Sequence, residues 1–213
     1  LTQAVGTNSV TFTADDHNAS DVYIEVVLTV TDSLGLSSTK SINMYLNNGA
    51  GSGNLVSNPS VEIEGLVAGS PLDWYQGWYG VMNPVFTYPA TGLVGDKAVQ
   101  LDVLSYENGG AKWFFSPSFV TSGSEYVFSN IYTATVGSDI TAQYGRADGS
   151  YFYEYLGFAP ATASPVRNNL HFTVPVGAQN VTIYQEVNNV GQIILDDFSL
   201  TLASNGDITI PTG

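Results

Sequence analysis

Aromatic side chains gather at three places in the sequence, and each place could hold a flat ligand. Trp74 and Trp78 lie in a predicted loop, and Trp113 begins a predicted strand. The third group consists of alternate residues of one predicted strand: Tyr151, Tyr153 and Tyr155. Three rings on one strand face stand about 7 Å apart. Because a sugar ring has an apolar face of C–H bonds and an equator of hydroxyls, aromatic platforms flanked by polar groups suit a saccharide. The alternative is that these rings fill the core.

Hydrogen-bonding side chains are predicted beside these rings. In the strand at 139–146, Gln143 faces away from the apolar side, and Arg146 ends the strand. In the strand predicted at 180–188, Tyr184 and Glu186 also face away from the apolar side. These four residues are candidates for the lining of a binding cleft, and an ordinary solvent-facing sheet is the alternative.

The supply of charged residues limits the classes of function. Five Lys and Arg stand against 19 Asp and Glu, for a net charge of -14. Such a chain repels phosphate backbones and anionic membranes, so nucleic acid is not an expected partner. No apolar run is long enough for a membrane span, and the first residues lack the pattern of a signal peptide, so membrane insertion is not expected and the chain has the appearance of a mature or excised piece.

Catalysis has few candidate residues. The chain has two His and no Cys. A glycosidase needs two opposed carboxylates, and the nearest local pair is Glu62 and Glu64. A lyase would use Tyr with His or Arg, for which Arg167 and His171 are the nearest candidates. Neither set is complete, so an enzyme is not predicted.

The elements that position these side chains are all predicted to be strands. Apolar alternation at 22–30 and 38–46 predicts an antiparallel hairpin, with a weaker strand at Val10 and Phe12. Residues 48–53 form a Gly/Ser linker between a first domain at 1–47 and a second at 54–203, and residues 204–213 form a tail. The second domain shows ten short β-type runs and no helical interval, which predicts an antiparallel sandwich of jelly-roll type. These runs lie at 55–63, 84–88, 97–104, 111–120, 125–135, 139–146, 151–158, 168–174, 180–188 and 192–202.

The segment from Val22 to Ile42 resembles the last hairpin of a PKD or related immunoglobulin-like domain, a spacer of secreted bacterial proteins. Three strands cannot bury both faces of a sandwich, so something should complete this partial domain. Upstream sequence, the second domain, or self-association with a neighbouring molecule would each do so. An oxygen-rich loop at 15–21 has the composition for calcium but lacks the pattern of an EF-hand, so a solvated loop is favoured.

The second domain resembles the jelly-roll carbohydrate-binding modules related to families 4, 9, 16 and 22. The run Asn54-Leu55-Val56-Ser57-Asn58-Pro59-Ser60-Val61-Glu62 is similar to their opening motif, and Ile194-Leu195-Asp196-Asp197-Phe198-Ser199-Leu200 to their closing one. Gly95-Asp96-Lys97-Ala98-Val99-Gln100-Leu101 resembles the strand between them. The resemblance implies a non-catalytic module that binds a polysaccharide or oligosaccharide.

The resemblance also implies a structural calcium ion that joins the first and last strands. Its expected ligands are the side chains of Glu62 and Asp196, with the carbonyl of Ser60 and Asp96 as further candidates. Asp196 shares parity with Ile194, Phe198 and Leu200, so it is predicted to face the core, where an unpaired carboxylate is costly. The alternative is that backbone N–H groups satisfy Asp196 at a strand end.

The function predicted from these observations is glycan binding within a secreted, multidomain polysaccharide-active or cell-surface protein. The resemblance implies a bacterial protein that is extracellular or held at the cell surface. The alternative function is a structural or adhesive surface protein that self-assembles through its β-domains.

Overall fold

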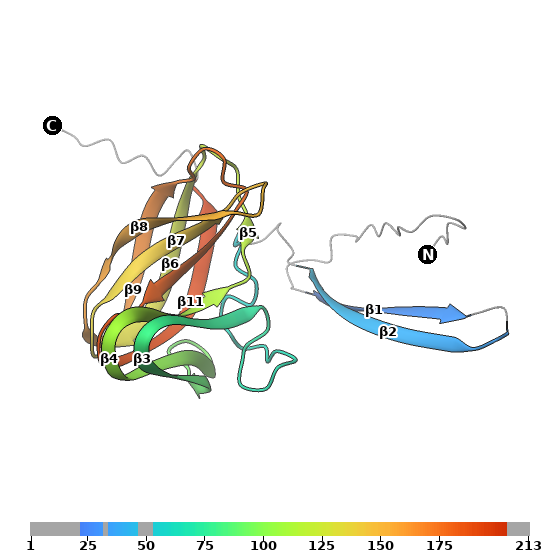
Figure 1. The fold of residues 1–213 in the computed structure, drawn as a ribbon, viewed down its shortest axis with the longest axis horizontal. Helices are drawn as coiled ribbons and strands as arrows, with labels where there is room; N and C mark the ends of the chain where they lie inside the picture. Colours follow the sequence, from blue (N-terminus) through green and yellow to red (C-terminus); the bar gives the residue numbers. More distant parts are fainter. Residues whose placement is uncertain (1–21, 32–33, 47–52, 204–213) are drawn as a thin grey trace. The chain divides into compact units, whose positions relative to one another are not determined.

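The computed structural model describes residues 22–31, 34–46 and 53–203. All the regular secondary structure in these ranges is β-strand. The chain divides into two compact units, residues 1–52 and 53–213. Figure 1 shows the first unit in blue and the second from teal to red. Within the described ranges no helix could span a membrane.

The first unit contains a regular hairpin. β1 (Val22–Thr31) pairs with β2 (Ser37–Leu46) in an unbroken antiparallel register, from Val22 opposite Leu46 to Thr31 opposite Ser37. The turn between them contains Gly35, whose φ of 84° is in the region that favours glycine. The predicted hairpin is therefore confirmed. The weaker strand at Val10 and Phe12 and the oxygen-rich loop lie outside the described residues.

The second unit is a sandwich of two antiparallel sheets, which confirms the predicted fold class. The five-stranded sheet has the order β3-β4-β11-β6-β9. Its strands are β3 (Trp74–Thr91), β4 (Lys97–Phe115), β6 (Glu125–Ala134), β9 (Thr162–Thr173) and β11 (Gly191–Leu202). The four-stranded sheet has the order β5-β10-β7-β8. Its strands are β5 (Ser118–Phe119), β7 (Ser138–Gly145), β8 (Tyr151–Ala159) and β10 (Asn180–Glu186).

Every second side chain of the strands points inward and fills the space between the sheets. In β6 the residues Tyr126, Phe128 and Tyr132 are buried while their neighbours are partly exposed. In β7 the inward residues are Ile140, Ala142 and Tyr144. This period of two is what a strand with one face on the core requires.

A polar link crosses the core between the two sheets. Asn130 of β6 donates a hydrogen bond from Nδ2 to Oε1 of Gln185 in β10, at 2.5 Å. Gln185 in turn donates to Oγ of Ser138 at 3.0 Å, and Asn168 donates to Oδ1 of Asn130 at 2.9 Å. These hydrogen bonds explain why an amide interrupts the apolar pattern of β10, because each buried polar group has a partner.

Strand β4 of the five-stranded sheet also contacts the four-stranded sheet. Its first half pairs with β11, from Val99 opposite Leu195 to Val103 opposite Gly191. Its second half runs beside β10, where Ala111 bridges to Val187 through two backbone hydrogen bonds. β3 pairs with β4 along both halves, so the two long strands form one bent hairpin, green in Figure 1.

The bent hairpin differs from the prediction in two ways. The predicted strands at 97–104 and 111–120 are one continuous strand as far as Phe115, and the predicted loop around 74–79 is the beginning of β3. The reason is that the intervening residues of β4, although polar and exposed, pair with β3 along an edge of the sheet.

The opening segment is not the regular strand predicted at 55–63. Positive φ angles at Asn58 and Val61 turn the chain there. The segment still lies against the last strand, because Leu55 N donates to Leu200 O and Phe198 N donates to Pro59 O, both at 2.8 Å. The opening and closing motifs are therefore joined by hydrogen bonds without a continuous ladder.

Candidate functional site

The outer face of the four-stranded sheet carries a row of exposed rings on β8. Tyr151, Tyr153 and Tyr155 are 57%, 62% and 62% exposed. The register places Tyr153 opposite Gln143 of β7 and Tyr155 opposite Thr141, so an amide and a hydroxyl stand beside the rings on the same face. We call this surface the tyrosine face: Tyr151, Tyr153, Tyr155, Thr141, Gln143, Tyr184, Glu186, Lys112 and Tyr79.

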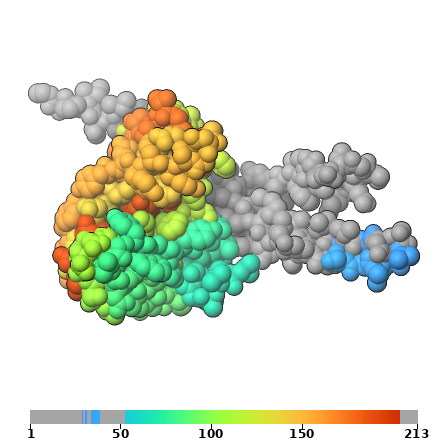
Figure 2. Space-filling view, in the orientation of Figure 1, coloured from blue at the N-terminus to red at the C-terminus, as the bar shows by residue number. Residues whose placement is uncertain are grey.

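The tyrosine face continues across β10 to the bent hairpin. Glu186 of β10 forms a salt bridge with Lys112 of β4 at 2.9 Å and accepts a hydrogen bond from the Tyr79 hydroxyl at 3.0 Å. The Lys112 ammonium lies 4.4 Å from the ring centre of Tyr184 and 5.3 Å from that of Tyr79. Figure 2 shows the surface hollowed between the orange part of the chain, which contains β8, and the green part, which contains β3.

The charges of this cluster are internally compensated. The side chains of Lys112 and Glu186 are only 15% and 16% exposed, so their attraction is less screened than on an open surface. Burial, and then the charge of Glu186, raise the pKa of Tyr184. Burial and the hydrogen bond to Glu186 raise the pKa of Tyr79. Both phenols therefore keep their protons at neutral pH, and that of Tyr79 donates its hydrogen bond to Glu186.

Two of the predicted ligand-binding residues are core residues, and the prediction is wrong for them. Trp74 and Trp113 are 3% and 1% exposed. Trp74 packs at 4.5 Å on Phe198, and Trp113 packs edge-on against Phe86 at 5.4 Å. The indole N–H groups donate to backbone carbonyls, which satisfies them inside the core.

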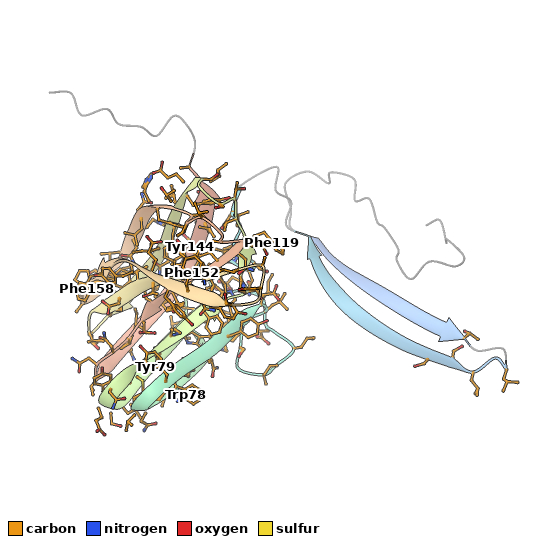
Figure 3. All side chains as sticks on the ribbon, turned by 45° about the horizontal axis from the view of Figure 1, so that its top comes forward. Trp78, Tyr79, Phe119, Tyr144, Phe152 and Phe158 are labelled. Carbon is orange, nitrogen blue, oxygen red and sulfur yellow. The ribbon has the colours of Figure 1, made fainter. Side chains whose placement is uncertain are left out.

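Two further predicted residues lie away from the tyrosine face. Trp78 is exposed, but it follows the opposite parity to Tyr79 along β3 and its ring centre lies 6.1 Å from that of Phe86. Figure 3 shows Trp78 and Tyr79 near the same end of the sandwich. The Arg146 guanidinium lies 4.1 Å from the ring centre of Phe152, which has the opposite parity to Tyr151 and Tyr153. The remaining predicted residues, Gln143, Tyr151, Tyr153, Tyr155, Tyr184 and Glu186, are brought together on one face.

Sequence reasoning missed Tyr79 and Lys112. Tyr79 lies in the segment at 74–79, for which the sequence predicts a loop, and Lys112 lies next to Trp113 at the start of a predicted strand. The usable signal is the spacing of Tyr75 and Tyr79, which places both rings on the same face if the segment is a strand.

The two predicted calcium ligands meet at one turn, residues 92–97. Asp196 is fully buried, and its carboxylate accepts hydrogen bonds from the backbone N–H groups of Leu93, Val94 and Asp197 at 2.7–2.9 Å. Glu62 accepts from the N–H groups of Asp96 and Lys97 through Oε1. We call this region the carboxylate seam: Glu62, Asp196 and the turn at 92–97.

The parity argument for Asp196 is wrong. The buried residues of β11 before Asp196 are Ile193 and Leu195, while Ile194 is partly exposed. The register places Asp196 opposite Ile131 and on the same face as Ile194, and the register shifts between Asp196 and Ser199. Asp196 is therefore buried under the turn at 92–97, on the outer side of its sheet.

The carboxylate seam offers a cation some of the ligands that calcium requires. Burial raises the pKa of Asp196, although the three N–H donors act in the opposite direction. The Asp96 side chain is exposed and only its backbone N–H contacts Glu62. Among the described residues, no three His, Cys, Asp or Glu side chains form a metal-binding group. A calcium ion here would depend on Glu62, Asp196 and backbone carbonyl oxygens.

Comparison with solved structures shows the same type of fold. The enzymatically active domain of tailspike protein 4 from bacteriophage CBA120 aligns with a TM-score of 0.56 and 16% identity, over 71% of this chain and 22% of that one. The chain therefore corresponds to less than a quarter of that tailspike domain. This likeness concerns the fold alone.

Carbohydrate-binding modules are also among the aligned structures. A family 11 module of a cellulosomal cellulase from Clostridium thermocellum aligns with a TM-score of 0.49 and 10% identity, over 72% of this chain and 97% of that one. The family 22 xylan-binding domain from a Paenibacillus barcinonensis protein has a TM-score of 0.44 and 13% identity, over 61% and 87% of the two chains. No protein-family model and no curated protein sequence matches the chain. The predicted PKD-like character of the first unit is not confirmed.

Proposed function

We propose that the second unit is a non-catalytic module that binds a neutral glycan on the tyrosine face. The observation that carries this proposal is the row of three exposed tyrosines on β8, two of which stand opposite a hydroxyl and an amide of β7. Flat rings stack on the apolar faces of sugars, while amides and hydroxyls bind their equatorial groups. The pKa values of Tyr79 and Tyr184 are raised, which argues against a tyrosinate base on this face.

The charge of the site favours an uncharged ligand. The described cation of the tyrosine face, Lys112, is paired with Glu186, and the whole chain carries a net charge of -14. An anionic polysaccharide would meet repulsion without a free cation on this face. We place the module in a secreted, multidomain protein outside the bacterial cell or at its surface, as the opening and closing motifs of the second unit suggest.

Replacing Tyr153 with alanine is expected to weaken glycan binding about tenfold, because the ring is an exposed platform at the centre of the row. Affinity electrophoresis against xylan, mixed-linkage β-glucan, β-galactan and an anionic pectin measures the effect. The matched control is Trp78→Ala, which removes an exposed ring of similar accessibility away from the tyrosine face. Migration of wild type unaffected by every neutral glycan would contradict the proposal.

A structural or adhesive role is the second candidate, and the hairpin of the first unit favours it. Within the described residues, β1 and β2 form a sheet of two strands. A sheet of this size is marginally stable alone and its edges can pair with another chain. Concentration-dependent assembly in sedimentation, combined with no retardation by any glycan, would support this role instead.

We also propose a structural calcium ion at the carboxylate seam. The convergence of the Asp196 and Glu62 carboxylates on the turn at 92–97 supports it, because a cation there would be favoured by two negative charges in addition to the N–H donors. A chelator is then expected to lower the melting temperature by about 5–10 °C, and added calcium to restore it. Asp196→Asn is the control and should respond weakly to either treatment. Identical melting curves of wild type in chelator and in calcium would exclude the ion.

A further inference from the structure

A β-bulge places a fourth ring, that of Phe158, on the tyrosine face. Along β8 the register runs Thr141 opposite Tyr155 and then Ile140 opposite Gly157, so one extra residue, Leu156, stands between them. Because Phe158 is three residues after Tyr155, it would face the core in a regular strand. The bulge returns it to the outer face, where it stands opposite Asp139 and is 59% exposed.

The Phe158 ring packs against a glycine, Gly137. A Cβ atom added at Gly137 would collide with the Phe158 ring, so the ring lies against the bare backbone at that position. Figure 3 shows Phe158 toward the far end of β8 from Phe152. The ring is therefore fixed against the sheet on one side and open to solvent on the other.

The solvent-exposed aromatic rings of this surface form a row along β8. The row does not extend across the sheet to β10 and β3. Tyr184 is 2% exposed and lies beneath the Lys112 ammonium, and the hydroxyl of Tyr79 is held by Glu186. By contrast, three of the four rings of β8, those of Tyr153, Tyr155 and Phe158, stand opposite polar side chains of β7, while Tyr151 stands opposite Gly145. The sequence of these polar residues along β7 is Asp139, Thr141 and Gln143.

We propose that Phe158 is a fourth stacking platform and that the glycan lies along β8, parallel to the strand. This inference rests on the proposed function and specifies its ligand. The row takes about four sugar rings of an unbranched, neutral chain at roughly 7 Å per platform. The carboxylate of Asp139, which already accepts a hydrogen bond from Asn188, offers a further acceptor to sugar hydroxyls beside Phe158.

The experiment compares oligosaccharides of increasing length, from disaccharide to hexasaccharide, cut from whichever neutral polysaccharide of the panel retards the wild type. Calorimetry of wild type is expected to show affinity rising up to the tetrasaccharide and then levelling. Phe158→Ala should bind the trisaccharide as wild type does and the tetrasaccharide roughly two- to tenfold more weakly, so that its affinity levels one sugar earlier.

Two further variants keep the result interpretable. Gly137→Ala displaces the ring without removing it and should also weaken tetrasaccharide binding. Phe119→Ala removes an exposed ring of the distant edge strand β5 and should change nothing. Wild-type affinity for the tetrasaccharide in Phe158→Ala would overturn this inference while leaving glycan binding intact. No binding of any glycan by wild type would overturn both.

Discussion

Replacing Trp113 with alanine is expected to lower the free energy of unfolding by about 3–5 kcal/mol. The ring is 1% exposed, packs against Phe86, and donates a hydrogen bond from Nε1 to the carbonyl of Gln100 at 2.9 Å. Its removal leaves a large cavity in the bent hairpin and deprives the partly buried carbonyl of Gln100 of this donor. Urea denaturation followed by circular dichroism measures the change.

Trp78→Ala is the matched control for this measurement. Trp78 lies on the neighbouring strand and follows the same parity, but it is 58% exposed, so its loss should cost much less, about 1 kcal/mol. A Trp113→Ala variant that unfolds like wild type but no longer binds glycan would contradict the assignment of Trp113 to the core and would place it in the binding site.

Replacing Asp196 with alanine is expected to lower the free energy of unfolding by about 3 kcal/mol or more, even in the presence of a chelator. Three backbone N–H groups, those of Leu93, Val94 and Asp197, lose a charged acceptor at once. Two of these groups hold the turn at 92–97 over the five-stranded sheet, so the turn should loosen as well. Hydrogen exchange of the amides of Leu93 and Val94 reports this directly.

The control for this prediction is the neighbouring carboxylate. Asp197 forms its ion pair with Arg167 on the surface, where such pairs contribute little, and asparagine tolerates its positive φ. Asp197→Asn should therefore change the stability by less than about 1 kcal/mol. Equal effects of Asp196→Ala and Asp197→Asn would contradict the role assigned to the carboxylate seam.

Most strands of the sandwich could be predicted because their inward and outward residues alternate. The ranges 125–135 and 151–158 differ from β6 and β8 by one residue at one end, and the range 139–146 differs from β7 by one residue at each end. The bent hairpin could not be predicted in the same way. Around Asn108, Gly109 and Gly110 the sequence has the composition of a turn, and only pairing with β3 keeps the chain extended.

The site was partly predictable for the same reason. The period of two in β8 places Tyr151, Tyr153 and Tyr155 on one face, but it does not say which face is outward. That depends on the register with β7. The alternation of side chains does not predict the face of a residue that follows a β-bulge. One bulge displaces Asp196 from the expected face, and another brings Phe158 to the outer face, although its distance from Tyr155 in the sequence predicts the inner one.

The backbone bridge from β4 to Val187 has a consequence for the energetics of ligand binding. Because β4 lies in the five-stranded sheet and is also bridged to Val187, just after β10 of the four-stranded sheet, backbone hydrogen bonds join the two layers, and we expect the second unit to behave as one cooperative body. The platforms would then keep their spacing before a ligand arrives. Association would lose little conformational entropy, which lets a shallow surface with few contacts hold a flexible polymer.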